Sequence, residues 1–188
     1  MKTGLIIAGV IVLVILIAGG WFIGGLNHVV RLDESVNSSW AQVENQLQRR
    51  NDLIPNLVNT VKGYAAHETG LLTKVTELRS QWGQAATREQ KMETANQMSS
   101  ALSRLLLVVE NYPDLKANQN FLALQSQLEG TENRIAVERM RYNNSVKAFN
   151  TYRRTVFGGF FASMRGLDQP REYFEVPESA KTVPQVQF

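Results

Sequence analysis

An uncharged apolar stretch near the amino terminus constrains this chain more than any other feature. It covers residues 4–26 and contains no Lys, Arg, Asp or Glu. A helix of roughly 23 residues is about 35 Å long, enough to cross a hydrocarbon core of about 30 Å with some tilt. No other segment is comparable, so we predict one membrane span followed by a domain tethered to the bilayer.

A cleaved signal peptide is the alternative interpretation of this stretch. Ala18, Gly19 and Gly20 offer small residues for a cleavage site. The apolar run nevertheless exceeds the roughly 7–15 residues of a signal-peptide core, continues through residues 21–23, and is preceded by little positive charge. We therefore favour a retained anchor.

The composition limits which domain, chemistry and partners the rest of the chain can have. About 160 residues follow the anchor, enough for one domain with its own core. The absence of cysteine excludes disulfides, thiol nucleophiles and cysteine metal sites. The 20 Lys and Arg against 17 Asp and Glu form a mixed surface, so we expect no nucleic-acid partner.

Apolar residues after the anchor recur with helical spacing in four segments. The first covers about residues 29–66, with a single polar position in its stripe, Arg50, and a kink expected at Pro55, which lacks a backbone donor. The second covers about residues 68–82 and stops at Gly83. The third begins after a capping box formed by Thr87 and Gln90, and ends before Pro113. Its apolar stripe consists of Met92, Ala95, Met98, Leu102, Leu105 and Val109. The fourth starts near residues 118–120, and its apolar residues recur every seven positions: Phe121, Leu128, Ile135, Tyr142, Phe149 and Val156.

This pattern predicts an all-α fold, in which an N-terminal transmembrane helix is followed by an antiparallel up-down helical bundle with two long helices. Short connections favour antiparallel neighbours, and four separate stripes each need a partner. An extended coiled coil is the alternative. We expect three parts: residues 1–26 as the anchor, 27–157 as the bundle, and 158–188 as an apolar segment with an extended tail.

The apolar residues after the fourth helix indicate a contact surface. We expect them either to cap the bundle or to touch the membrane, and we favour the cap, because bundle ends need apolar cover. The residues concerned are Phe157, Phe160, Phe161, Met164 and Leu167.

No catalytic or metal-binding pattern stands out. His67 and Glu68 start like a zinc protease motif, but the second histidine is missing. Gly158 and Gly159 lack the Lys-Ser/Thr element of a phosphate loop. The arginines of the fourth helix are interleaved with acids, which favours a solvated helix surface over an anionic binding patch. We expect neither an enzyme nor a cofactor nor a metal site.

Several strings strongly resemble the bacterial LemA family over nearly the whole chain. They are WAQV from Trp40, QLQRRNDLIPNLV from Gln46, VKGY from Val61, YPDLKA from Tyr112, LEGTENRIA from Leu128, RYN from Arg141, YFE from Tyr173, and the terminal VQF. The chain departs from the family at Gly158, where proline is common. The resemblance implies a single-pass membrane protein with a helical bundle, and supplies no catalytic residues.

We predict a non-enzymatic, membrane-anchored protein that acts as an oligomeric scaffold or assembly factor. A membrane-surface binding or remodelling module is the alternative, and a membrane-bound hydrolase a distant one. The partners expected are the lipid bilayer, further copies of the chain, and other membrane proteins. Two small-residue pairs in the span, Gly4 with Ala8 and Gly20 with Gly24, would let packed spans approach closely.

Two further expectations concern charge. The few basic residues flanking the span favour an amino terminus in the cytoplasm and a domain outside the bacterial inner membrane. Within the bundle, an antiparallel pairing of the two long helices places Arg50 within one turn of Glu138, so we predict an interior ion pair between them.

Overall fold

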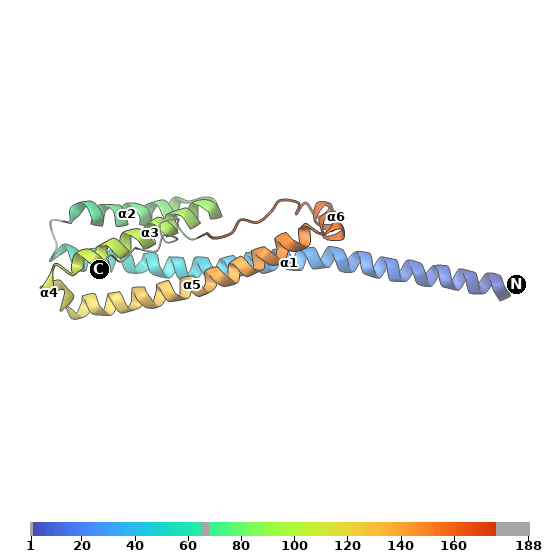
Figure 1. Ribbon diagram of the computed structural model, residues 1–188, viewed down its shortest axis with the longest axis horizontal. Helices are drawn as coiled ribbons and strands as arrows, with labels where there is room; N and C mark the ends of the chain where they lie inside the picture. Colours follow the sequence, from blue (N-terminus) through green and yellow to red (C-terminus); the bar gives the residue numbers. More distant parts are fainter. Residues whose placement is uncertain (1, 65–67, 176–188) are drawn as a thin grey trace, which may run out of the picture. The chain divides into compact units, whose positions relative to one another are not determined.

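The structure, a computed structural model, describes residues 2–64 and 68–175. These residues form helices and no strand, which confirms the predicted all-α class (Figure 1). His67 and the residues from 176 onward, with the terminal VQF, lie outside the described part. The helices are α1 Lys2–Lys62, α2 Thr69–Gln84, α3 Arg88–Val109, α4 Pro113–Lys116, α5 Gln119–Arg153 and α6 Val156–Met164.

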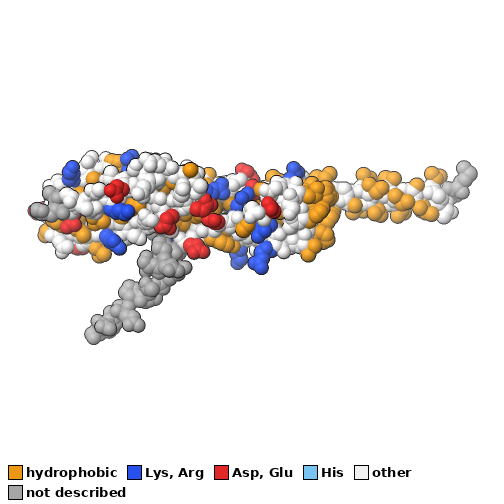
Figure 2. All heavy atoms as spheres, turned by 90° about the horizontal axis from the view of Figure 1, so that it is seen from above, with side chains coloured by type: hydrophobic (Ala, Val, Ile, Leu, Met, Phe, Trp, Pro, Cys, Tyr) orange, Lys and Arg blue, Asp and Glu red, His pale blue; other side chains and the backbone are white. Residues whose placement is uncertain are grey.

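The apolar stretch and the first bundle helix form one uninterrupted helix. We expected a boundary between the anchor and a helix starting near Val29, but α1 continues through Gly24, Gly25 and His28. A glycine in a helix costs only about 1 kcal/mol, which neighbouring packing can offset. The N-terminal part of α1 is long and apolar enough to cross a membrane, and its side chains are exposed (Figure 2).

The chain divides into two compact units. Of the described residues, unit 1 contains 2–40 and 141–173, and unit 2 contains 41–64, 68–140, 174 and 175. Each is described separately below. The three-part division expected from the sequence stays a prediction.

In unit 1, α1 packs against the last part of α5. The rings of His28 and Tyr152 lie 4.6 Å apart, and those of Trp40 and Tyr142 lie 5.5 Å apart. Since the α5 residue number falls as the α1 number rises, the two helices are antiparallel, as predicted. Their shared core is formed by Val29, Val36, Trp40, Tyr142, Val146 and Phe149, all nearly inaccessible to solvent.

The segment after α6 returns along α5 as an extended strap. The side chain of Asn150 donates to the carbonyl of Arg171 over 2.8 Å and accepts from its N–H over 2.9 Å. The hydroxyl of Tyr142 donates to the carbonyl of Glu172, and Nη2 of Arg171 lies 2.6 Å from Oδ1 of Asp33. The start of the predicted tail is therefore extended but bound to the helices.

In unit 2, one apolar core joins residues of α1, α2, α3, α4 and α5. The third predicted stripe is confirmed in full, since Met92, Ala95, Met98, Leu102, Leu105 and Val109 are all buried. The helices α2 and α3 lie side by side as a hairpin (Figure 1). Further core residues come from the other helices: Ile54, Leu57 and Val61 of α1, Leu115 of α4, and Phe121 and Leu128 of α5.

Local capping explains where these helices begin. Thr87 and Gln90 form the predicted capping box, in which each side chain bonds the other's backbone N–H. Pro113 opens α4, where a missing N–H costs nothing. Asn118 accepts from the N–H groups at the start of α5. Gly83 does not stop its helix, since α2 continues to Gln84.

Candidate functional site

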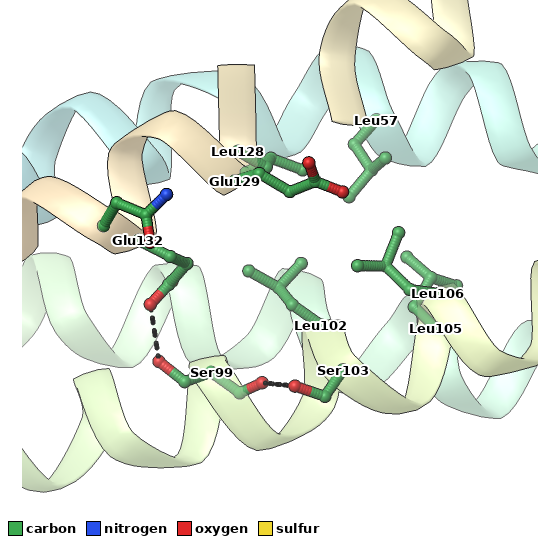
Figure 3. A pocket seen from close by; sticks show the side chains of 10 residues that line it. Leu57, Ser99, Leu102, Ser103, Leu105, Leu106, Leu128, Glu129 and Glu132 are labelled. Atoms are coloured by element: carbon green, nitrogen blue, oxygen red, sulfur yellow. Dashed lines mark hydrogen bonds between the residues drawn. The ribbon is translucent and has the colours of Figure 1, made fainter. Parts of the chain in front are cut away.

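A cleft in unit 2 opens between α3 and α5, and Leu57 of α1 contributes to its lining. Its volume is about 440 Å³. The apolar lining consists mainly of leucines, which face the cleft from both sides (Figure 3). They are Leu57, Leu102, Leu105, Leu106 and Leu128. The polar lining consists of Ser99, Ser103, Glu129, Glu132 and Asn133.

Arg50 reaches this cleft from the core, and its side chain is only 1% exposed. Its Nη1 lies 2.7 Å from Oε1 of Glu132 and donates to Oγ of Ser99 over 2.8 Å. Its Nη2 donates to the carbonyl of Ala95 over 3.1 Å. One guanidinium on α1 is thus bonded to both α3 and α5, so it fixes the register of three helices.

The partner expected for Arg50 was Glu138, and the structure replaces it with Glu132. Glu138 lies six residues later on α5, about 9 Å farther along the helix axis. Our estimate of the antiparallel register was accurate only to within a turn, and both acids fell inside that margin. Glu132 can also remain partly hydrated, because its side chain is 37% exposed while it neutralises the buried cation.

The polar groups around the cleft hold helices together. The hydroxyl of Ser99 on α3 accepts from Arg50 of α1 and donates to Oε2 of Glu132 on α5 over 3.4 Å. Within α3, the hydroxyl of Ser103 donates to the carbonyl of Ser99 (Figure 3). Burial lowers the pKa of the nearby Arg139 below its usual value, and the charge of Glu132 opposes this shift. Glu132 therefore lies near two cationic side chains, those of Arg50 and Arg139.

A metal site is not formed by the described residues. Within residues 2–64 and 68–175, no group of three His, Asp or Glu side chains is placed to hold an ion. The arrangement in the cleft can position helices or bind an apolar group, and it offers no set of metal ligands.

Sequence analysis missed Glu132, Ser99 and Arg79 as partners of the first helix. Nε of Arg79 donates to the carbonyl of Asn51, over 3.2 Å. The available signal was Pro55, which leaves that carbonyl without its helical donor. No comparable signal distinguished Glu132 from the neighbouring acids of α5.

The membrane-proximal end of unit 1 contains a cluster of aromatic rings. Trp21 contacts Phe157 and Phe161, with ring centroids 5.1 Å and 5.4 Å apart. Phe22 contacts Phe160 and Phe161, at 6.4 Å and 5.7 Å. The apolar segment after α5 therefore packs on the C-terminal end of the predicted span.

This segment partly caps unit 1 and partly faces outward. Phe161 is 2% exposed, whereas Phe157, Phe160 and Met164 are 61%, 53% and 54% exposed. Leu167 has intermediate exposure. The buried face of α6 thus packs on unit 1, and the membrane contact expected from the sequence stays a prediction for the exposed face.

The small residues of the span have open surroundings. A Cβ added at Gly4, Gly20 or Gly24 would meet no atom within 4 Å, and Ala8 is exposed. Gly25 differs, because a Cβ there would overlap the ring of Phe161. Gly25 therefore leaves room for the ring of Phe161, by which α6 packs on α1. The other small residues remain available for the packing predicted between spans.

In the part of the chain that the structure describes, these features define the class of all-helical proteins with one N-terminal helix long and apolar enough to span a membrane. A model of the LemA family matches residues 39–188. Because this covers most of the chain, the chain belongs to the LemA family, and the resemblance noted in the sequence is confirmed.

Three curated relatives are similar to this chain over most of its length. Protein LemA of Metamycoplasma hominis is 24% identical over 69% of this chain and 60% of its own length. Magnetosome protein MamQ 2 of Paramagnetospirillum magneticum is 24% identical over 83% of this chain and 66% of its own length. Magnetosome protein MamQ of Magnetospirillum gryphiswaldense is 23% identical over 80% of this chain and 65% of its own length. The chain thus spans about two thirds or less of the length of these relatives.

Proposed function

We propose that the protein is a non-enzymatic scaffold or assembly factor, anchored in the bacterial inner membrane and oligomeric there. The observation that carries this proposal is the continuity of α1. The same helix supplies the exposed apolar residues of the predicted span and the buried core residues Val36, Leu47 and Leu57. Anchorage and bundle are therefore built from one element, as expected of a protein that organises others at a membrane.

Support for a non-catalytic role comes from the interior polar groups. Arg50 is a buried charged side chain among the described residues of unit 2. Its charge is neutralised by Glu132, and its two Nη atoms donate to Ser99, Glu132 and a backbone carbonyl. Such a network stabilises helix register and leaves little chemistry for a substrate. The printed names of the relatives, Protein LemA and Magnetosome protein MamQ 2, also refer to no reaction.

Oligomerisation is supported by the open faces of Gly20 and Gly24. Small residues four apart let two spans approach closely in lipid. Replacing both by leucine should lower the mass of the detergent-solubilised species. A wild type that is already monomeric by light scattering in mild detergent would remove this part of the proposal.

The orientation that we propose places the bundle outside the cytoplasm. Protease treatment of intact spheroplasts tests it directly. Digestion of the bundle before lysis supports the proposal, and survival of the bundle until lysis reverses the orientation.

The scaffold role is tested by affinity purification of the tagged full chain in mild detergent, followed by identification and sizing of the complex. The matched control keeps the bundle and replaces the span by a leucine-rich one. We expect the wild type to retain specific partners that the control loses in part. Recovery of single 21.1 kDa chains without partners would contradict the proposal.

A membrane-surface binding module is the second candidate. The exposed aromatic face of α6, beside the span, favours it. The two roles are compatible, since a scaffold protein can also bind the surface of the bilayer. Binding of anionic vesicles by the bundle without its span distinguishes a surface module from a scaffold that depends on the span alone.

A further inference from the structure

Helix α6 has two distinct faces. It contains no charged residue, and Thr155 caps its start by accepting from the N–H of Gly158. One face packs on the protein and is buried, with Gly158, Phe161 and Ala162. The other face is apolar and exposed. At 100° per residue its members fall within an arc of about 100°, and they are Val156, Phe157, Phe160 and Met164.

The position of α6 is fixed by the end of the predicted span. The ring of Phe161 lies directly on Gly25, where any side chain would overlap it. The rings of Trp21 and Phe157 meet edge to face at 5.1 Å. Trp21 belongs to the uncharged stretch of α1, so α6 lies beside the level at which that stretch ends.

Exposure of this apolar face to water is energetically unfavourable. Val156 is 87% exposed, and the other three side chains are more than half exposed. Figure 2 shows hydrophobic side chains gathered where the apolar part of α1 leaves the rest of unit 1. Burial of apolar side chains is favourable roughly in proportion to the area removed from water, so an occupant that covers this face is strongly favoured.

Continuity with the span identifies that occupant as lipid. Tryptophan and other aromatic residues concentrate where a span meets the headgroup layer. Arg154 and Arg165 flank α6 and are exposed, which matches the basic ends of helices that lie in a membrane interface. A protein partner at this level would itself have to lie within the bilayer surface.

We propose that α6 is an interfacial helix, which lies in the boundary layer of the bilayer with Val156, Phe157, Phe160 and Met164 among the acyl chains. The span and α6 would then hold unit 1 at two points of the membrane. This proposal rests on the membrane anchorage proposed above, and is independent of the scaffold role and of oligomerisation.

The test uses single-cysteine labels, which the chain permits because it has no cysteine of its own. The full chain carries Phe160→Cys or Met164→Cys with a polarity-sensitive fluorophore, in vesicles of phosphatidylethanolamine and phosphatidylglycerol. Two quenchers are compared, a spin label near the headgroup end of the acyl chain and a water-soluble nickel chelate. Leu107→Cys, at an exposed position of unit 2, serves as the aqueous control.

Labels at 160 and 164 should be quenched several-fold more by the lipid spin label than the label at 107, and less by the nickel chelate. Equal access of the chelate to positions 160 and 107 would overturn the proposal. Protection of positions 160 and 164 from both quenchers would also overturn it, since a protein would then cover α6. The second position guards against a fold defect caused by replacing Phe160.

A label in the span separates this outcome from failure of the anchorage. Val14→Cys lies in the exposed apolar part of α1 and should be quenched by lipid whatever α6 does. If position 14 is quenched and positions 160 and 164 are not, the interfacial helix is refuted while the anchor stands. If position 14 is also reached by the chelate, the anchorage fails, and the proposal for α6 fails with it.

Discussion

Nε of Arg79 donates a hydrogen bond to the backbone carbonyl of Asn51, and so supplies the donor that Pro55 lacks. In a regular helix the N–H of residue 55 would bond this carbonyl. The proline therefore converts a bond within α1 into a bond between α1 and α2. This explains how α1 continues through Pro55 without an orphaned buried carbonyl.

A double-mutant cycle tests this relationship. Arg79→Met keeps an apolar stem and removes the donor, so the free energy of unfolding should fall by about 1–2 kcal/mol. In a Pro55→Ala background the same change should cost only a few tenths of a kcal/mol, because residue 55 then supplies the N–H. Guanidinium denaturation of the full chain in mild detergent measures both. Equal costs in the two backgrounds would show that Arg79 contributes by packing alone.

The identity of the acid opposite Arg50 leads to a second prediction. Glu132→Gln removes the charge that neutralises a buried guanidinium, and should cost about 3 kcal/mol of unfolding free energy. Arg50→Met should cost about 1–2 kcal/mol, because the partly exposed Glu132 can hydrate when its partner is lost. Glu138→Gln is the comparison on the same helix, and both substitutions are repeated in an Arg50→Met background. If the cost of Glu138→Gln disappears in that background while the cost of Glu132→Gln remains, the interior pair has been assigned to the wrong acid.

Replacement of Asn51 should raise the free energy of unfolding, unlike the substitutions above. Its side chain is buried at 4% exposure, and neither Oδ1 nor Nδ2 has a hydrogen-bond partner in the described part of the chain. An unpaired buried amide is costly, so Asn51→Leu should raise the free energy of unfolding by about 1 kcal/mol. Asn56→Leu, at an exposed site of α1, controls for helix propensity. Destabilisation by Asn51→Leu alone would reveal an ordered water or ligand on the amide.

Tyr112 and Glu68 make a pH-dependent contact. The tyrosine hydroxyl donates to Oε1 of Glu68 over 3.3 Å. Partial burial, and then the charge of Glu68, raise the pKa of Tyr112 above its usual 10.0. The folded state therefore holds this proton more tightly than the unfolded chain. The contribution is complete below the unfolded pKa and is lost as the pH rises through the folded pKa.

The stability of the wild type should accordingly fall more steeply above about pH 10 than that of Tyr112→Phe. Unfolding of both proteins across the alkaline range measures the difference. Tyr173→Phe leaves the Tyr112–Glu68 pair intact and should behave like the wild type. Parallel curves for all three proteins would remove the role assigned to Tyr112.

Hydrophobic periodicity and helix-capping motifs predicted the helices well, because both signals depend on the spacing of residues close in the sequence. The stripe from Met92 to Val109 and the Thr87–Gln90 capping box are present as predicted. Helix ends were less accurate, as at Gly83, because glycine weakens a helix by an amount that packing can offset. The same reason explains why α1 continues through Gly24 and Gly25.

Contacts between distant segments could not be read from the sequence to the same precision. A register error of one turn was enough to exchange Glu132 for Glu138, since several acids recur along α5. The strap bonded by Asn150 and Tyr142 left no periodic signal, because an extended segment that bonds through its backbone constrains its own side chains little. For α6, the sequence revealed apolar content but not which face would meet Gly25.

The packing of α6 on the predicted span leads to the last prediction. The adjacent glycines Gly24 and Gly25 allow a matched pair of substitutions. Gly25→Ala adds a methyl group that overlaps the ring of Phe161, whereas Gly24→Ala meets no atom within 4 Å. Overpacking should lower the unfolding free energy of the Gly25→Ala chain by about 1–3 kcal/mol. Gly24→Ala should leave it unchanged or raise it by up to about 1 kcal/mol, through better helix propensity.

Repeating both substitutions in a Phe161→Ala background isolates the contact between Gly25 and Phe161. Phe161→Ala lowers stability by itself, but it removes the ring that the new methyl group would strike, so Gly25→Ala and Gly24→Ala should then have equal effects. Both replacements keep a small residue in the span, so a change in packing between spans does not confuse the comparison. Indistinguishable effects of the two alanines in the presence of Phe161 would mean that α6 does not rest on Gly25, and that the aromatic cluster is held to the span in another way.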